Sequence, residues 1–182
     1  MPDYPLHGYA IVSDDDRITD AEGRFPEVLR NDADWDYFQA GLDRAALTLL
    51  GRRSHEASPN EKSRLRLVMS RSAQALERRP DAWWWNPAGL PLAEALRIVA
   101  PGGGAVAVPG GQEVFDHVGA ARFSTFHLAR AHGRRLPGGR GLFADCEKGV
   151  TADAVLASGG LTPGPMVWLD EPARVSLIVW TK

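Results

Sequence analysis

One stretch constrains the fold of this chain more than any other, the segment from Val106 to Phe115 with the sequence Val-Ala-Val-Pro-Gly-Gly-Gln-Glu-Val-Phe. The apolar residues at 105–108 predict a buried strand, which the Pro-Gly-Gly sequence ends, and residues 112–118 predict a helix. A strand that turns on glycines into a helix presents free backbone N–H groups and the positive end of a helix dipole. Because glycine has no Cβ, the diphosphate of a dinucleotide could approach this turn closely. By itself the motif is equally compatible with a tight turn that binds nothing.

Two other predicted strands end in residues that suit phosphate binding. The strands at 46–50 and 66–69 are each followed by arginine and hydroxyl side chains. Arginine suits phosphate because its planar donor fork is fixed and always charged. The second cluster could hold a ribose phosphate and so favour NADP over NAD, although an ordinary polar loop explains it equally well. The first cluster is Gly51, Arg52, Arg53 and Ser54, and the second is Ser70, Arg71 and Ser72.

An acidic residue in the first third of the chain is the candidate for contact with a substrate. A strand is predicted at 8–13, and Asn31 or Asp32 could cap a later helix whose apolar face includes Phe38. Asp34 lies one turn before Phe38, so the two side chains are neighbours on the helix surface. An acid beside an aromatic ring could hydrogen-bond a flat heterocycle. Taken alone, Asp34 is more simply explained as a first-turn acid that the helix dipole favours.

The remaining pattern predicts an α/β fold in a single domain over residues 1–182. A strand is expected at Trp83–Trp85, a helix at 92–99, a strand at 122–128 and a short strand within 151–164. Residues 166–169 and 174–181 flank Asp170-Glu171-Pro172 and predict an antiparallel hairpin. Alternating strands and helices indicate a mostly parallel central sheet with helices on both faces. The hairpin adds an antiparallel end to that sheet.

Composition excludes several classes of function. A net charge of −2 argues against a general binder of nucleic acids or acidic membranes. The single cysteine, Cys146, excludes an internal disulfide and a cysteine-cluster metal site. Three adjacent aspartates, Asp14 to Asp16, lack the spacing of a calcium loop, so no metal site is expected. No Ser-His-acid arrangement suggests a hydrolase. Neither a signal peptide nor an apolar run of about 20 residues is visible, so we expect a cytoplasmic protein.

With these motifs in order, the chain resembles the dihydrofolate reductase superfamily, which includes the reductase domain of bacterial riboflavin biosynthesis. The resemblance runs from about Leu6 to Asp145, and the final hairpin is also in place. It rests on the opening strand and acidic loop, the acid one turn before a Phe, Gly-Arg-Arg-Ser-His-Glu, Val-Met-Ser-Arg-Ser and Pro-Gly-Gly-Gln-Glu-Val-Phe, in that order. The later Phe-His-Leu and Leu-Pro-Gly-Gly-Arg-Gly-Leu-Phe are more similar to the riboflavin-type branch.

The resemblance implies an NADPH-dependent reductase. Asp34 matches the acid that hydrogen-bonds the pterin ring, Phe38 the aromatic residue beneath it, and Arg64 the residue that grips the folate glutamate. Phe126 stands where the family usually has a threonine beside that acid, so it is a further candidate for substrate binding. Residues 18–26 match the mobile lid over the nicotinamide. The implied cofactor residues are Ile18, Gly51, Arg52, Arg53, Ser54, Ser70, Arg71, Ser72, Gly110, Gly111, Gln112, Glu113, Val114 and Phe115.

Besides Phe126, the chain departs from the family pattern at several places, among them a longer spacing from Pro26 to Asp34. Pro26 is followed by Glu27 instead of the tryptophan that shapes the reduction site, and Pro109 and Gln112 replace an isoleucine and a third glycine. Three substrates therefore stay open: dihydrofolate, dihydromethanopterin, and the ribosylaminopyrimidine phosphate of riboflavin synthesis. The alternative from another class is a non-catalytic nucleotide- or flavin-binding module. A homodimer is also compatible with the sequence, if Trp83 or Trp85 is exposed.

Overall fold

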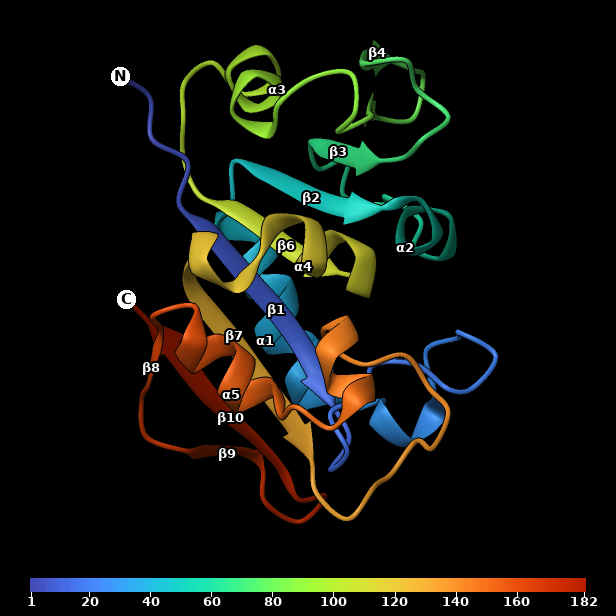
Figure 1. The fold of residues 1–182 in the computed structure, drawn as a ribbon, viewed down its shortest axis with the longest axis vertical. Coiled ribbons are helices and arrows are strands. Elements are labelled where there is room, and N and C mark those ends of the chain that lie inside the picture. The colour runs from blue at the N-terminus through green and yellow to red at the C-terminus, as the bar shows by residue number, and fades with distance from the viewer.

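A computed structural model describes residues 1–182, which form one ten-stranded mixed sheet covered by helices (Figure 1). The strand order is β4-β5-β3-β2-β6-β1-β7-β10-β8, with β9 paired to β10. The strands are β1 (Leu6–Val12), β2 (Leu47–Gly51), β3 (Arg66–Met69), β4 (Leu76–Arg78), β5 (Trp83–Trp85), β6 (Val106–Gly110), β7 (Phe123–Ala131), β8 (Thr162–Pro163), β9 (Val167–Asp170) and β10 (Val175–Thr181). The helices are α1 (Asp32–Arg44), α2 (Arg52–Ala57), α3 (Leu92–Val99), α4 (Gln112–Val118) and α5 (Ala152–Ser158), with short 3-10 helices at Glu27–Leu29, Ala120–Arg122 and Ala144–Lys148.

The sheet is parallel in its centre and antiparallel at both ends, which confirms the predicted fold class. Strands β5, β3, β2, β6, β1 and β7 run in the same direction. Strand β4 is antiparallel to β5, and β10 is antiparallel to β7, β8 and β9. The predicted C-terminal hairpin is therefore present as β9 and β10, and it extends the sheet beyond β7.

Helices cover both faces of the sheet, and alternation along each strand decides which residues meet which helix. Figure 1 shows α4 and α5 in front of the sheet and α1 behind it. The front face carries the largest core cluster, 25 buried residues that include Phe115 and Phe126. On the back face Tyr9 packs with Leu42 of α1 and Ala107 of β6. Because successive side chains on a strand point to opposite faces, this arrangement follows from the apolar pattern of each strand.

Helix α1 begins and ends where its sequence indicates. Asn31 is the N-cap, and its side chain accepts a hydrogen bond from the backbone N–H of Asp34. Close packing of this helix on the sheet depends on Gly41, since a Cβ there would lie 2.6 Å from the ring of Tyr9. The helix runs opposite to the parallel strands, so its first turn lies towards their carboxyl ends. Asn31 confirms this placement by donating to Asp170 of β9 at 2.9 Å.

Two expectations about the later chain are corrected. Residues 151–164 form helix α5 and a two-residue strand instead of a short strand alone, because Thr151 caps the helix and Ala152 and Leu156 share one buried face. The tryptophan run forms β5 as predicted, but Trp85 is fully buried and Trp83 is partly covered by the guanidinium of Arg78. Trp85 therefore offers no exposed face for a dimer. No helix has the length and apolar character needed to cross a membrane.

Candidate functional site

The three predicted phosphate-binding segments meet at the carboxyl edge of the sheet. Strands β3, β2 and β6 are neighbours, with Gly51 opposite Met69 and Leu50 opposite Gly110 in the parallel registers. The residues that follow these strands therefore lie side by side, near α2 in Figure 1. This convergence depends on strand order, because carboxyl ends of parallel strands share an edge only within a sheet. Such an edge is the usual ligand site of open α/β sheets.

The glycine pair makes a close approach that no other residue type allows. Gly110 has φ +103°, and a Cβ there would lie 2.7 Å from the ring of Phe115. A Cβ on Gly51 would be 3.8 Å from the backbone nitrogen of Gly111, so the ends of β2 and β6 are in contact. Ile18 lies on the other side of this turn, with its Cδ1 4.0 Å from the Cβ position of Gly111. The turn is thus bounded by the strand end on one side and the lid on the other.

Three of the residues expected at the cofactor hold the turn with their side chains and could meet a ligand only through their backbone. Val114 and Phe115 are buried in the core. Gln112 is also buried, and its amide donates to the carbonyl of Gly141 and to the carboxylate of Glu147. Glu113, in contrast, is exposed in the first turn of α4.

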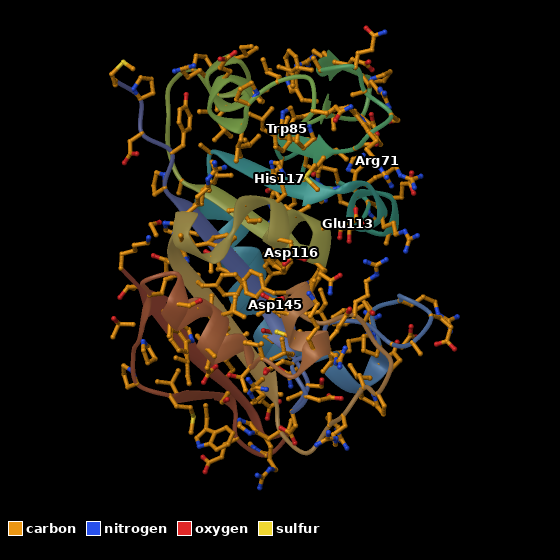
Figure 2. All side chains as sticks on the ribbon, viewed as in Figure 1. Arg71, Trp85, Glu113, Asp116, His117 and Asp145 are labelled. Atoms are coloured by element: carbon orange, nitrogen blue, oxygen red, sulfur yellow. The ribbon has the colours of Figure 1, made fainter.

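Cationic side chains gather at the same edge. Arg52 is exposed and lies 3.6 Å from Glu56, while Arg53 extends towards the lid, with its Nη1 3.6 Å from the Cβ position of Gly23. Arg71 is exposed and forms no ion pair; Figure 2 places it and Glu113 on the same side of the molecule. Because surface pairs such as Arg52 with Glu56 are weak, all three guanidinium groups can be recruited by an anion.

The two serines after β3 form a compact hydroxyl cluster beside Arg71. The hydroxyl of Ser70 donates to Ser72 Oγ at 2.9 Å, and Ser70 Oγ accepts from the Ser72 backbone N–H at 3.1 Å. Arg79 also donates to Ser72 Oγ, at 3.3 Å. Ser54 lies in the first turn of α2 and makes no side-chain hydrogen bond. The arrangement can present hydroxyl groups and guanidinium groups to one phosphate.

The lid is fixed at its base by a network around Asp16. Arg130 Nη2 donates to Asp16 Oδ1 at 2.7 Å, and the backbone N–H of Ala152 donates to Asp16 Oδ2 at 2.9 Å. Further along, the N–H of Ile18 donates to the carbonyl of Arg140 at 2.8 Å. These bonds attach the lid to the loop that precedes the 3-10 helix at Ala144–Lys148. Ile18 is thereby held over the glycine pair.

Asp34 has the character of a proton donor or a ligand for a ring nitrogen. It is half-buried in the first turn of α1, and its carboxylate makes no hydrogen bond within the protein. Burial raises the pKa of Asp34 to about 6. Phe38 lies one turn further along and contacts the ring of Tyr9, with centroids 5.8 Å apart. Asp34 therefore lies at the end of α1 nearer the carboxyl edge, and Phe38 follows it in the middle of the helix, one turn away as the sequence indicated.

A stacked pair on the back face of the sheet was not anticipated. The rings of Tyr9 and His127 are parallel, with centroids 4.3 Å apart, and Tyr37 Oη lies 2.6 Å from His127 Nδ1. Burial lowers the pKa of His127 to about 4, with smaller contributions from His7 and Arg44, so the imidazole is neutral at pH 7. Successive residues of a strand point to opposite faces of the sheet, so the sequence places His127 on the face away from Phe126. This alternation is the sequence signal that could have identified His127 as a back-face residue.

Two expected substrate residues are corrected. Phe126 is fully buried on the front face, where it packs against Phe115 and Phe123, so its ring is on the wrong side of the sheet to meet a ligand near Asp34. Arg64 is already neutralised by Asp43, to which its Nη2 donates at 2.6 Å, and its Nη1 donates to Gln39 Oε1 at 2.9 Å. Its guanidinium serves to join β3 to α1 and is not available to a carboxylate tail.

Comparison with known proteins identifies the fold. No protein-family model matches the chain, and no curated protein sequence matches it. Among solved structures, dihydrofolate reductase from Enterococcus faecalis, in complex with NADP(H) and RAB-propyl, has a TM-score of 0.67 at 16% identity over 97% of this chain and 95% of its own. A protein assigned to riboflavin biosynthesis from Shewanella sp. PV-4 has a TM-score of 0.66 at 15% identity over 97% and 98%.

A third similar structure is the diaminohydroxyphosphoribosylaminopyrimidine deaminase/5-amino-6-(5-phosphoribosylamino)uracil reductase from Thermotoga maritima. It matches with a TM-score of 0.68 at 10% identity, over 98% of this chain but 56% of its own. All three similarities cover almost the whole of this chain. The chain therefore has the fold of the dihydrofolate reductase superfamily.

Proposed function

We propose that this protein is an NADPH-dependent reductase that transfers a hydride to a C=N bond of a dihydropterin-type substrate. The observation that carries the proposal is the meeting of arginines, hydroxyls and a glycine pair from three strand ends at one edge of the sheet. One of the similar structures is a reductase in complex with NADP(H). The residues present fit such a cofactor, because positive charge and close backbone approach are what a diphosphate needs.

Each group at this edge has a part in the proposed site. Arg52, Arg53 and Ser54 would hold the diphosphate with the glycine pair, and the cluster of Ser70, Arg71 and Ser72 would hold the 2′-phosphate. Ile18 would cover the nicotinamide from the lid. NADPH, when bound, supplies the hydride. The protein positions two flat rings and excludes water, which is how an enzyme of this kind accelerates transfer.

Asp34 is the proposed catalytic residue. Its carboxyl group has no partner in the protein, so it can hydrogen-bond a ring nitrogen directly or through water. A pKa of about 6 leaves part of the population protonated near neutral pH, and a general acid works best in that range. The proton delivered to the nitrogen balances the hydride delivered to the adjacent carbon. Phe38 would lie beneath the ring.

Within this class, dihydrofolate and dihydromethanopterin are the first candidates. Arg64 was the residue that favoured dihydrofolate, because it could bind the glutamate tail of that substrate. Its ion pair with Asp43 removes this argument. The second candidate is a ribosylaminopyrimidine, which the similarity to the Thermotoga maritima reductase favours. NADPH oxidation measured with each of the three substrates would separate them. NADPH binding without oxidation of any would instead support a non-catalytic module.

The decisive experiment replaces Asp34. The Asp34→Asn variant should lower kcat by about 100-fold or more, because the proton donor is lost, while NADPH affinity measured by fluorescence stays nearly unchanged. Asp36→Asn, an exposed acid in the same helix, is the matched control and should behave as the wild type. Loss of cofactor binding in Asp34→Asn would show that the residue is misassigned. Absence of NADPH binding in the wild type would end the proposal.

A further inference from the structure

A cavity lies on the back face of the sheet, away from the carboxyl edge. It has a volume of about 340 Å³ and opens between the last turn of α1 and the beginnings of β1, β6 and β7. Its polar lining comes from Arg44, His7, Tyr9, Thr125 and His127. Since α1 runs opposite to the strands, this cavity is at the other end of the helix from Asp34. No proposed contact of the reductase site uses it.

The lining is basic and contains no acid. Arg44 is exposed at the end of α1 and forms no ion pair, although the neighbouring Asp43 pairs with Arg64 and Lys62. The guanidinium faces the cavity closely enough to lower the pKa of both His7 and His127, in each case after the larger effect of burial. No carboxylate offsets this positive charge within the cavity. An unbalanced cation beside a lined cavity favours an anionic ligand.

One buried polar atom in the cavity wall has no partner. His127 Nε2 is buried and makes no hydrogen bond, while its Nδ1 lies 2.6 Å from Tyr37 Oη. When Tyr37 donates to Nδ1, the ring proton is on Nε2 and an acceptor is missing. A buried donor without an acceptor costs free energy, but this nitrogen is closed off from water, so a ligand oxygen in the cavity reaches it only if the ring moves. Thr125 adds a hydroxyl to the same wall.

We propose that this cavity is a binding site for a small oxyanion of the phosphate type, either free or as part of a small phosphorylated molecule. Arg44 would form the charge-assisted contact, His7 and Thr125 would supply hydrogen bonds, and the His127 ring would form part of the wall. The volume exceeds what inorganic phosphate needs, which leaves room for a short organic portion. The site is independent of cofactor binding, since its residues are separate from the carboxyl edge.

The simplest competing explanation is that Arg44 only balances the negative end of the α1 dipole. Arg97 provides a matched control, because it also lies in the last turn of a helix, is exposed and forms no ion pair. If the dipole accounts for Arg44, the two arginines should be equivalent in every binding measurement. If the cavity binds an oxyanion, only Arg44 should matter.

The test is NMR titration of the histidine ring resonances with inorganic phosphate, in parallel with glycerol 3-phosphate. The chain has five histidines, so each site has its own reporter. Binding at the cavity should shift His7 and His127, whereas phosphate at the arginines after β2 should shift His55 in α2. Tighter binding of glycerol 3-phosphate would identify an organic phosphate as the ligand, and equal binding would identify the free ion.

Arg44→Gln should weaken phosphate binding at His7 and His127 by about 10-fold, through loss of one charge-assisted contact. Arg97→Gln should leave the titration unchanged. Wild-type resonances of His7 and His127 that do not move with either ligand would overturn the proposal, as would equal affinity in Arg44→Gln. Because the His55 signal and NADPH binding are read separately, failure here leaves the reductase proposal to its own test.

Discussion

At the scale of the residue, the burial of Asp34 makes the stability of the protein depend on pH. Its pKa is raised from an unfolded value of about 3.9 to about 6, so the native state holds more protons than the unfolded state between these values. The free energy of unfolding therefore falls as pH rises from about 4 to about 6, because the buried Asp34 carboxyl group loses its proton in this range. Asp34→Asn should increase the free energy of unfolding at pH 7 by about 1 kcal/mol, allowing for screening at a half-buried site, and by nothing at pH 3. Urea unfolding at both pH values measures this, with exposed Asp32→Asn as the control. A gain of equal size at both pH values would contradict the assignment.

At the scale of the element, the position of the lid (residues 18–26) depends on the hydrogen bonds of Asp16, which lies just before it. Asp16 has φ +58° and bonds both Arg130 and the first residue of α5. Asp16→Asn keeps a residue that tolerates this backbone conformation but removes the charge beside Arg130. We expect about 2 kcal/mol less stability and faster hydrogen exchange at the Ile18 amide. Glu22→Gln, at an exposed acid further along the lid, should change neither quantity by much. Unchanged exchange at Ile18 in Asp16→Asn would show that the base does not hold the lid.

At the scale of the whole molecule, the core lies mainly on one face of the sheet, and α5 helps to close it. Leu156 is fully buried in the largest core cluster although α5 belongs to a segment with weak sequence signals. Leu156→Ala should cost about 2–5 kcal/mol because it leaves a cavity in that core. Ile98→Ala, at a position that is 53% exposed, should stay within about 0.5 kcal/mol of the wild type. Urea unfolding followed by tryptophan fluorescence and circular dichroism tests both. A loss below about 1 kcal/mol for Leu156→Ala would mean that α5 is not part of the cooperative core.

Local chemistry in the sequence was enough to predict most elements and to place three arginine-, hydroxyl- or glycine-rich segments after strands. The ranges of β3, β5, α3 and α4 agree with the predicted ones, because apolar periodicity and flanking glycine or proline determine them locally. Asn31 caps α1 as its side chain indicates. The convergence of the three segments that we propose to bind phosphate could be predicted, because each follows a strand of a parallel sheet. Helix α5 was missed because its signal is short and depends on burial against the rest of the molecule.

Only the tertiary structure decided which side chains are free to bind a ligand. The sequence offers Arg64 and Phe126 as ligand contacts. In the structure, Asp43 of α1 neutralises Arg64, and Phe126 is buried on the front face of the sheet. The stack of Tyr9 on His127 joins residues more than one hundred positions apart. Such contacts depend on strand order and register, which are set by packing of the whole core and not by any local run of residues. The sequence by itself therefore determined most elements and the sheet edge at which we propose that a cofactor binds, and the fold decided which side chains are free there.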